Sequence, residues 1–104
     1  AGFDIYYQDP LGGMRVTPDG FAALTRILLN IADSCCAGKM AAVLEGGYHI
    51  SGLTKSVKCV LEEMLNETHC PEEILAAFTQ SANDETNRLI SHVTNKVNQF
   101  WKLG

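Results

Sequence analysis

The sequence lacks the features that mark membrane proteins, nucleic-acid-binding proteins and disordered chains. Its 104 residues carry a formal net charge of -4, so no basic field is available to hold nucleic acid or anionic lipid. The longest apolar runs, such as residues 40–44, are far too short to span a bilayer. Charged residues make up 19% of the chain and hydrophobic residues 46%, which predicts one small folded domain.

Cysteine and histidine are present, but not in patterns that bind a metal by themselves. The cysteines are Cys35, Cys36, Cys59 and Cys70, and the histidines are His49, His69 and His92. No Cys-x-x-Cys pair occurs, so we expect reduced thiols in a cytoplasmic protein rather than a zinc cluster or disulfides. We expect His49 at a helix start or pocket edge, and the other two histidines on the surface.

Apolar residues spaced by three and four predict about four helices. Thr17 as the N-cap, Pro18 at the first helical position and Asp19 in the first turn mark the start of the first helix. Its predicted core stripe contains Phe21, Leu24, Leu28, Ile31 and Cys35. The spacing predicts further helices over about residues 50–66, shortly after Pro71, and over about residues 85–102.

One strand is predicted, over residues 39–45. Its apolar residues form a continuous run rather than an alternating one, which is typical of a strand buried on both faces of a parallel sheet. A lone strand is not stable, and the preceding helix implies a crossover from an earlier parallel strand. That earlier strand would lead directly into Ala1, so we expect the chain to be part of a longer domain.

Two loops are expected to meet at the carboxyl edge of this sheet, where ligands bind in open parallel sheets. Asp4 follows the inferred earlier strand, and Gly46-Gly47-Tyr48 follows the predicted one. Asp4 is either a turn or cap carboxylate or a metal ligand or acid/base. The Gly-Gly-Tyr segment is either a tight turn with a packing tyrosine or a site at which the Tyr48 hydroxyl donates to a substrate.

Four segments, in this order and spacing, resemble the zinc-dependent histone deacetylase family, which includes bacterial deacetylase-like amidohydrolases and acetylpolyamine amidohydrolases. They are Ala1-Gly2-Phe3-Asp4, Asp9-Pro10-Leu11-Gly12-Gly13-Met14, Thr17-Pro18-Asp19-Gly20-Phe21 and Leu44-Glu45-Gly46-Gly47-Tyr48. Glu45 is typical of the class II and bacterial branches. The resemblance covers about residues 1–65, and residues 66–104 match only as a variable helical tail. It implies that residues 1–104 are the C-terminal part of an α/β catalytic domain of the arginase–deacetylase type, with a central parallel sheet.

The resemblance also implies a role for individual residues around a catalytic Zn²⁺. Asp4 falls on a zinc ligand, and Tyr48 on the tyrosine that hydrogen-bonds the substrate carbonyl and its oxyanion. Gly46 and Gly47 fall where backbone lines the acyl end of the tunnel, and Pro10 and Leu11 fall on the tunnel rim. The polyamine-specific branch has an acidic gatekeeper at the position of Leu11, which favours a different substrate here.

The family's Asp-x-His motif and tandem histidines, which supply the other zinc ligands and the acid/base pair, are absent from the sequence. We therefore expect this chain alone to be inactive, with the N-terminal part of the domain as its partner. The expected reaction is hydrolysis of N-acetyl-lysine or a small acetylated amide to acetate and free amine. The alternatives are an acetylpolyamine amidohydrolase, a non-catalytic acyl-lysine-binding module and a structural fragment. We expect no nucleic acid or membrane partner, and a homo-oligomer is compatible with the sequence.

Overall fold

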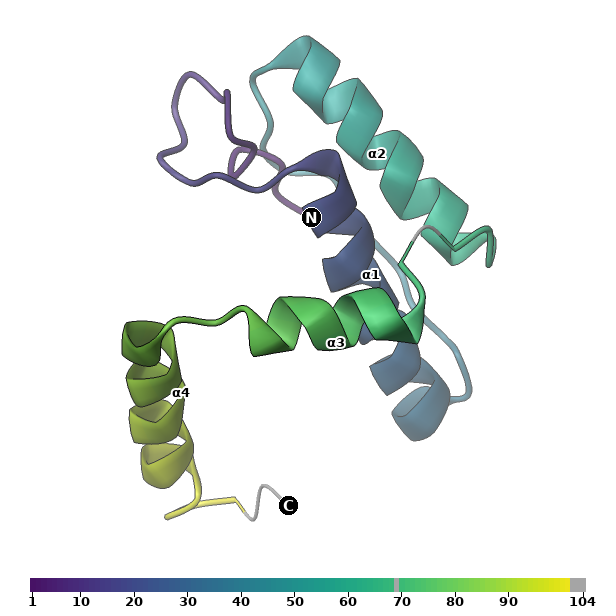
Figure 1. The fold of residues 1–104 in the computed structure, drawn as a ribbon. Helices are drawn as coiled ribbons and strands as arrows, with labels where there is room; N and C mark the ends of the chain where they lie inside the picture. The colour runs from purple at the N-terminus through teal and green to yellow at the C-terminus, as the bar shows by residue number, and fades with distance from the viewer. Residues whose placement is uncertain (69, 102–104) are drawn as a thin grey trace. The chain divides into compact units, whose positions relative to one another are not determined.

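The computed structural model describes residues 1–68 and 70–101, apart from the Thr79 side chain, and the expectation for His69 lies outside this part. Its helices are α1 (Pro18–Cys36), α2 (Ile50–Met64), α3 (Glu72–Gln80) and α4 (Asp84–Val97) (Figure 1). The chain divides into two compact units, Ala1–Glu72 and Glu73–Gly104, which are described separately. In the described ranges, no helix combines the length and the apolar character needed to cross a bilayer.

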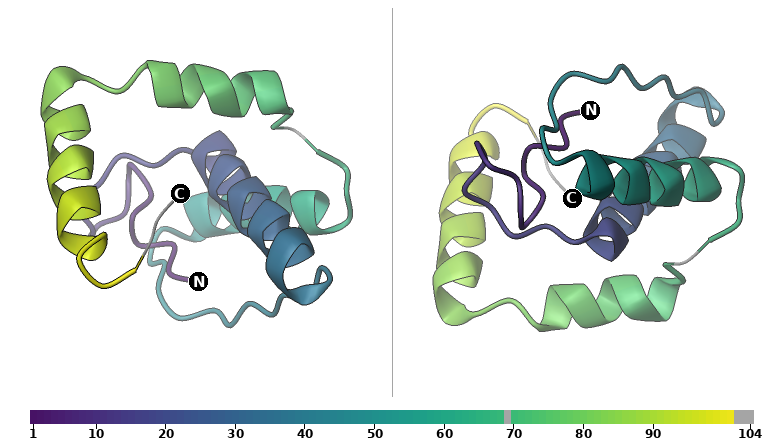
Figure 2. Two further views of the ribbon diagram at one scale, coloured as in Figure 1. Left: turned by 90° about the horizontal axis from the view of Figure 1, so that it is seen from below. Right: turned by 90° about the horizontal axis from the view of Figure 1, so that it is seen from above.

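Helix α1 begins and ends where the sequence predicted. The Thr17 side chain accepts a hydrogen bond from the Gly20 N–H at 3.2 Å and caps the helix, and Pro18 follows at its first position. At the other end Ala37 and Gly38 take left-handed conformations, with φ of 55° and 74°, which turn the chain out of the helix. Helix α1 packs against α2, as the ribbon views show (Figure 2).

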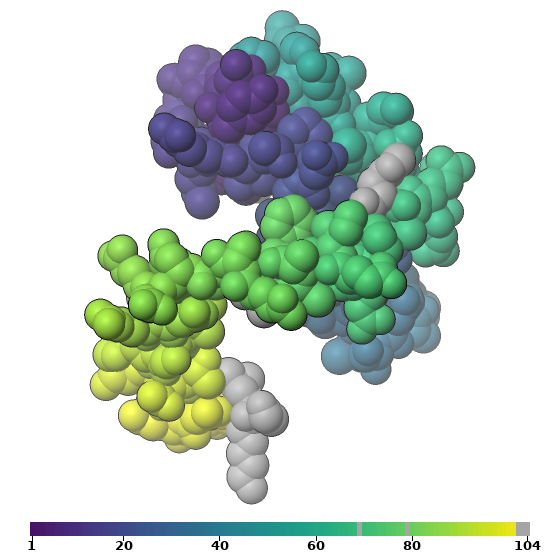
Figure 3. Space-filling model, viewed as in Figure 1, coloured from purple at the N-terminus to yellow at the C-terminus, as the bar shows by residue number. Residues whose placement is uncertain are grey.

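Helix α2 encloses the core of the first unit together with α1 and the N-terminal loop. The His49 ring caps α2 by accepting a hydrogen bond from the Gly52 N–H at 2.9 Å, which confirms the expected helix start. Phe3, Tyr6 and Phe21 are the buried hydrophobic residues of this core. The core is completed by the partly buried Ile5, Val16, Leu53, Val57 and Val60. The N-terminal loop therefore packs directly on the helices, as the space-filling view shows (Figure 3).

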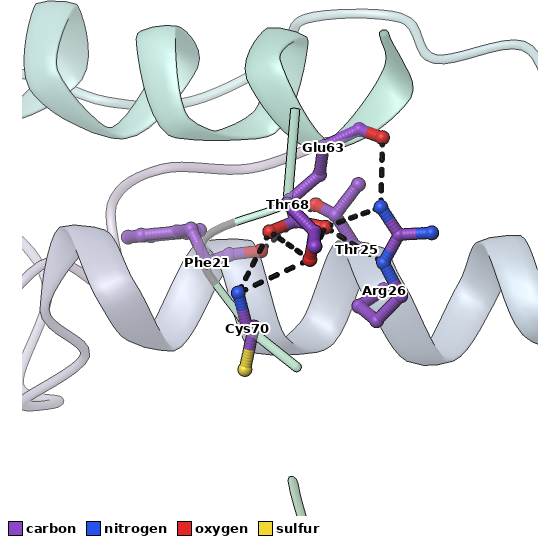
Figure 4. Close-up of polar contacts among 6 residues, drawn as sticks. All are labelled: Phe21, Thr25, Arg26, Glu63, Thr68 and Cys70. Atoms are coloured by element: carbon purple, nitrogen blue, oxygen red, sulfur yellow. Dashed lines mark hydrogen bonds and ion pairs between the residues drawn. The ribbon is translucent and has the colours of Figure 1, made fainter. Parts of the chain in front are cut away.

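A buried ion pair joins α1 to α2. Glu63 of α2 is fully buried, and its Oε2 accepts a hydrogen bond from Arg26 Nε of α1 at 2.7 Å (Figure 4). The Thr68 hydroxyl donates to both Glu63 carboxylate oxygens, and the Cys70 N–H donates to Oε1 at 3.1 Å. This carboxylate therefore fixes three segments at once: α1, α2 and the connection to α3.

The predicted strand over residues 39–45 is wrong as a strand: the described residues contain only one isolated β-bridge, between Tyr6 and Val16. Residues 39–45 are extended but not part of a sheet, and Val43 and Leu44 are 73% and 57% exposed instead of buried. The physical reason is that a strand needs neighbours along its length. Here the Ala1 nitrogen donates to the Val43 carbonyl at 2.6 Å, and the Ala1 carbonyl accepts from the Glu45 N–H at 3.1 Å. This is the parallel pairing pattern, confined to one residue.

The predicted core stripe of the first helix is also largely exposed. Leu24, Leu28 and Ile31 are 48%, 55% and 53% exposed. Their side of α1 lines a groove of about 690 Å³, together with residues 40–43 and Phe3. The stripe is apolar as predicted, but the described part of the chain has no element that covers it. Phe21 is the one member of the stripe that is buried, and the other buried residues of α1 are Ala22, Ala23, Thr25 and Ala32.

The second unit consists of α3 and α4. The Asn83 side chain accepts a hydrogen bond from the Thr86 N–H at 2.8 Å and caps α4. Helix α4 ends at Val97, earlier than its apolar spacing predicted. None of its residues is buried, and His92 lies on the surface as expected. Phe100 and Trp101, which follow α4, are also exposed.

Candidate active site

The two loops singled out from the sequence lie side by side, which confirms that part of the prediction. The Phe3 N–H donates to the Gly46 carbonyl at 2.8 Å, so the segment before Asp4 runs along the segment before Tyr48. The Tyr48 N–H donates to Asp9 Oδ2 at 2.8 Å, across 39 positions of the sequence. The two loops are therefore joined at both ends of the first loop, by a backbone hydrogen bond at Phe3 and by the Asp9 side chain, which accepts from the backbone of Tyr48.

Glycine allows the backbone to approach Asp4 closely. A Cβ atom placed on Gly46 would lie 3.1 to 3.3 Å from the carboxyl carbon and oxygens of Asp4. A Cβ atom on Gly12 would lie only 1.6 Å from the Asp4 carbonyl oxygen. Asp4 itself is half-buried. Its carboxylate is therefore bordered by backbone that carries no side chain, which leaves its oxygens room to meet a ligand.

Tyr48 lies at the junction between this glycine pair and α2. The preceding Gly47 has φ of 135°, a conformation that side-chain-bearing residues rarely adopt, and a Cβ atom there would lie 2.8 Å from Phe3 Cβ. The Tyr48 side chain is 57% exposed. Its phenol is thus exposed to solvent at the edge of the loops, and its hydroxyl can donate a hydrogen bond.

Pro10 and Leu11 are both exposed, Leu11 to 74%, on a turn that begins at Asp9. This turn is closed by the Asp9 side chain, whose Oδ1 accepts from the Leu11 N–H at 2.9 Å and the Gly12 N–H at 3.0 Å. The predicted rim residues therefore project from a turn whose position is set by a buried carboxylate.

Asp9 is the residue that the sequence reasoning missed. Its side chain is 8% exposed, and burial by itself would raise the pKa of its carboxyl. Hydrogen bonds from the backbone of Tyr48, Leu11, Gly12 and His49 outweigh this effect and hold the pKa below its ordinary value. An aspartate before proline is a familiar turn signal, and it could have predicted the local bonds. The bond to Tyr48 has no local signal.

The described residues contain no group of three or more histidine, cysteine, aspartate or glutamate side chains that could hold a metal ion. Asp4 alone is a carboxylate of the type that zinc accepts as a ligand, but a catalytic zinc site needs three protein ligands. The described residues could therefore supply one ligand of a zinc ion, but they do not form a complete zinc site.

Comparison with known proteins places the chain among deacetylases. The model of the histone deacetylase domain family matches residues 1–64. Histone deacetylase 15 of Arabidopsis thaliana is 35% identical over 101 residues, which are 97% of this chain and 17% of that protein. Polyamine deacetylase HDAC10 of Mus musculus is 42% identical over 82 residues, 79% of this chain and 12% of that protein.

A solved structure agrees with these sequence matches. The crystal structure of the HDA15 HD domain superposes with a TM-score of 0.73 and 30% sequence identity, over 97% of this chain and 24% of that one. The chain thus spans well under a quarter of the curated relatives it matches, and about a quarter of the solved domain. On the matched segments and the matched fold, the chain belongs to the histone deacetylase family.

Proposed function

We propose that this chain is the C-terminal part of a zinc-dependent catalytic domain that hydrolyses an acetylated amine to acetate and the free amine. The substrate is N-acetyl-lysine or a small acetylated amide. The observation that carries this proposal is the junction of the two loops, where Gly46 borders the Asp4 carboxylate and Asp9 holds the backbone of Tyr48. The chain supplies only part of such a site and is inactive alone.

Asp4 would hold the zinc ion as one of its carboxylate ligands, and the other ligands come from the N-terminal part of the domain. When bound, zinc polarises the amide carbonyl and lowers the pKa of a bound water towards neutrality. The glycine at position 46 supports this role, because any larger residue there would press on the Asp4 carboxyl group.

Tyr48 would act on the oxygen of the substrate carbonyl. Negative charge develops on this oxygen as the carbonyl carbon becomes tetrahedral, and a phenol hydroxyl that donates to it stabilises the transition state more than the ground state. The exposure of Tyr48 supports this role, since its hydroxyl is free to meet a substrate. Backbone at Gly46 and Gly47 would line the acyl end of the tunnel, with Pro10 and Leu11 at its mouth.

The rest of the domain is the partner that this chain requires, and we propose that it covers the apolar groove of α1 and completes a central parallel sheet. The groove is lined by exposed apolar residues, of which Leu28 and Ile31 are examples. The parallel pairing of Ala1 with residues 43 and 45 supports this proposal, because it is the hydrogen-bond pattern that neighbouring strands of a parallel sheet would share. The matched HD domain is about four times as long as the segment this chain covers, which is enough chain to supply both.

We also propose that the protein is cytoplasmic, and its free cysteines support this location. Cys35 and Cys36 are exposed at the end of α1, Cys59 is half-buried, and Cys70 is buried. Free thiols persist in a reducing compartment, whereas secreted domains of this size usually pair them.

A second candidate reaction is deacetylation of an acetylated polyamine. It is favoured by the relative from Mus musculus, which is named a polyamine deacetylase and is 42% identical over 82 residues. It is disfavoured by Leu11, whose exposed apolar side chain offers nothing to a polyamine cation at the rim. A non-catalytic acyl-lysine-binding module remains the alternative outside catalysis.

The test uses the full-length protein, by which we mean this chain within a complete deacetylase domain, with zinc content measured in each sample. An acetyl-lysine peptide and an acetylated polyamine are assayed side by side. We expect turnover of the peptide, and a roughly 100- to 1000-fold lower kcat in Tyr48→Phe with unchanged zinc content. A higher kcat/KM for the polyamine would favour the second reaction. Absence of turnover with zinc bound would favour the binding module, and an unaffected Tyr48→Phe would refute the role of the hydroxyl.

A further inference from the structure

The Asp9 side chain binds both the proposed tunnel rim and the proposed catalytic loop. Its Oδ1 accepts hydrogen bonds from the N–H groups of Leu11 and Gly12, at 2.9 and 3.0 Å. Its Oδ2 accepts from the Tyr48 N–H at 2.8 Å. One carboxylate thus spans two loops that are far apart in the sequence, and each oxygen serves a different loop.

The bonds of Asp9 are of a strong and directional kind. The side chain is buried, and neither ion pair found among the described residues involves it. Its negative charge is therefore stabilised by the backbone N–H groups that donate to it. Hydrogen bonds from backbone N–H groups to an ionised carboxylate are shorter and stronger than hydrogen bonds between neutral groups. The lowered pKa keeps Asp9 ionised near neutral pH, where all of these bonds remain available.

Tyr48 needs such an anchor because its side chain has little packing of its own. The phenol is 57% exposed, and the residue before it adopts a conformation typical of glycine. The position of the hydroxyl therefore depends on where the backbone of Tyr48 is held. Helix α2 holds the following residues through the His49 cap, and Asp9 holds Tyr48 itself.

We propose that Asp9 is a positioning residue for catalysis, which fixes the Tyr48 hydroxyl relative to the rim turn without touching the substrate. This inference rests on the proposed function, because it assumes that Tyr48 acts in the reaction. Oxyanion donors are effective only within a few tenths of an ångström of their working position, and a shift of about 1 Å can cost 100-fold in rate. A carboxylate that fixes the Tyr48 backbone would limit such shifts.

The first experiment compares Asp9→Asn with the wild type in the full-length, zinc-loaded protein. An asparagine amide can accept on one side only, so its NH₂ group faces a backbone N–H on the other and one loop is released. We expect kcat to fall about 10- to 100-fold, with little change in KM and in zinc content. Asp33→Asn makes the same chemical change at an exposed position on α1 and should behave as the wild type.

A double-mutant cycle separates positioning from a general structural role. If Asp9 acts through the Tyr48 hydroxyl, Asp9→Asn should slow Tyr48→Phe by less than about threefold, because the group that it positions is already gone. If the two effects multiply instead, Asp9 acts independently of Tyr48 and the inference is overturned. It is equally overturned if Asp9→Asn retains the wild-type kcat.

Hydrogen exchange gives a readout that does not depend on activity, and its wild-type measurement does not depend on the variant's folding. In the wild type the amides of Tyr48, Leu11 and Gly12 should all be protected, and in a folded Asp9→Asn the Tyr48 amide or the Leu11 and Gly12 amides should lose protection. Unprotected Tyr48 in the wild type would overturn the anchoring itself. A wild type that binds zinc, protects these amides and gives no turnover would instead show that the proposed function fails while the anchoring holds.

Discussion

Two neighbouring glycines on the rim turn show how sharply the site constrains single residues. A Cβ atom on Gly12 would overlap the Asp4 backbone, whereas a Cβ atom on Gly13 would meet no atom within 4 Å. Gly46 is intermediate, because the three atoms nearest to its added Cβ would all belong to the Asp4 side chain. The sequence shows the same residue at positions 12, 13 and 46, and only the contact distances in the structure show that a side chain would be tolerated differently at each.

Gly46→Ala should weaken zinc binding more than it weakens folding. The new methyl group would lie 3.1 to 3.3 Å from the Asp4 carboxyl atoms, so the carboxylate must move by a few tenths of an ångström. We expect zinc affinity in the full-length protein to fall roughly 10-fold, as when a group that orients a ligand is lost. Competition with a chelator of known affinity measures this, with Gly13→Ala as the matched control. Equal affinities in both variants would argue against Asp4 as a ligand.

At the scale of helices, α1 and α2 are joined by both an apolar core and a buried charge pair. The carboxylate of Glu63 is completely buried, while the side chain of Arg26 is 16% exposed. Breaking such a pair is expensive, because the remaining charge keeps its desolvation cost without its partner. Burial next to Glu63 also raises the pKa of the Cys70 thiol, through desolvation first and the nearby carboxylate second. This thiol therefore stays protonated and unreactive near neutral pH.

Glu63→Gln should destabilise the protein by about 3 kcal/mol, because it leaves the Arg26 guanidinium without its carboxylate. Glu62→Gln is the matched control, one position earlier on the same helix. Glu62 pairs with Lys58 at 3.3 Å on the surface, an arrangement worth at most about 0.5 kcal/mol. Urea unfolding monitored by circular dichroism gives both values. Similar losses in the two variants would mean that the buried pair contributes no more than the surface one.

At the scale of the whole molecule, large hydrophobic residues of the described part of the chain are more often exposed than buried. Leu24, Leu28 and Ile31 lie along one side of α1 and line a groove together with the exposed residue Val43. Exposed apolar patches of this kind mark surfaces that are covered by another part of a protein. The chain also covers only 24% of the HDA15 HD domain. Both observations support the proposal that the groove of α1 lies inside a larger domain.

Ile31→Lys tests whether the groove is covered in the full-length protein. If the rest of the domain packs there, the substitution removes a buried side chain and buries a charge, and it should cost at least about 2 kcal/mol of unfolding free energy. Asn30→Lys adds the same charge at the neighbouring exposed position and should cost less than about 0.5 kcal/mol. Chemical denaturation of both variants decides the matter. Equally small losses would leave the groove open to solvent.

Local signals in the sequence were sufficient for the starts of the helices, whereas the adjacency of the two loops was inferred from the order of the predicted elements. Thr17 and Pro18 predict the start of α1 because a cap is satisfied by a residue three positions away. The resemblance to deacetylases also rests on short segments whose spacing is visible in one dimension, and the family match over residues 1–64 confirms it. The roles assigned to Asp4 and Tyr48 stay predictions.

Tertiary structure decided which apolar residues are buried, and which carboxylates matter. The run at residues 39–45 has the composition of a buried strand, but a strand exists only where neighbours share its hydrogen bonds along its length. Here the parallel pairing is that of Ala1 with Val43 and Glu45. Asp9 reads as an ordinary turn residue, and its bond to Tyr48 forms only when the chain folds back 39 positions later. The sequence by itself determined the family and the helices, because these depend on near neighbours. The anchoring of Tyr48 depends on a distant contact, which only the folded chain provides.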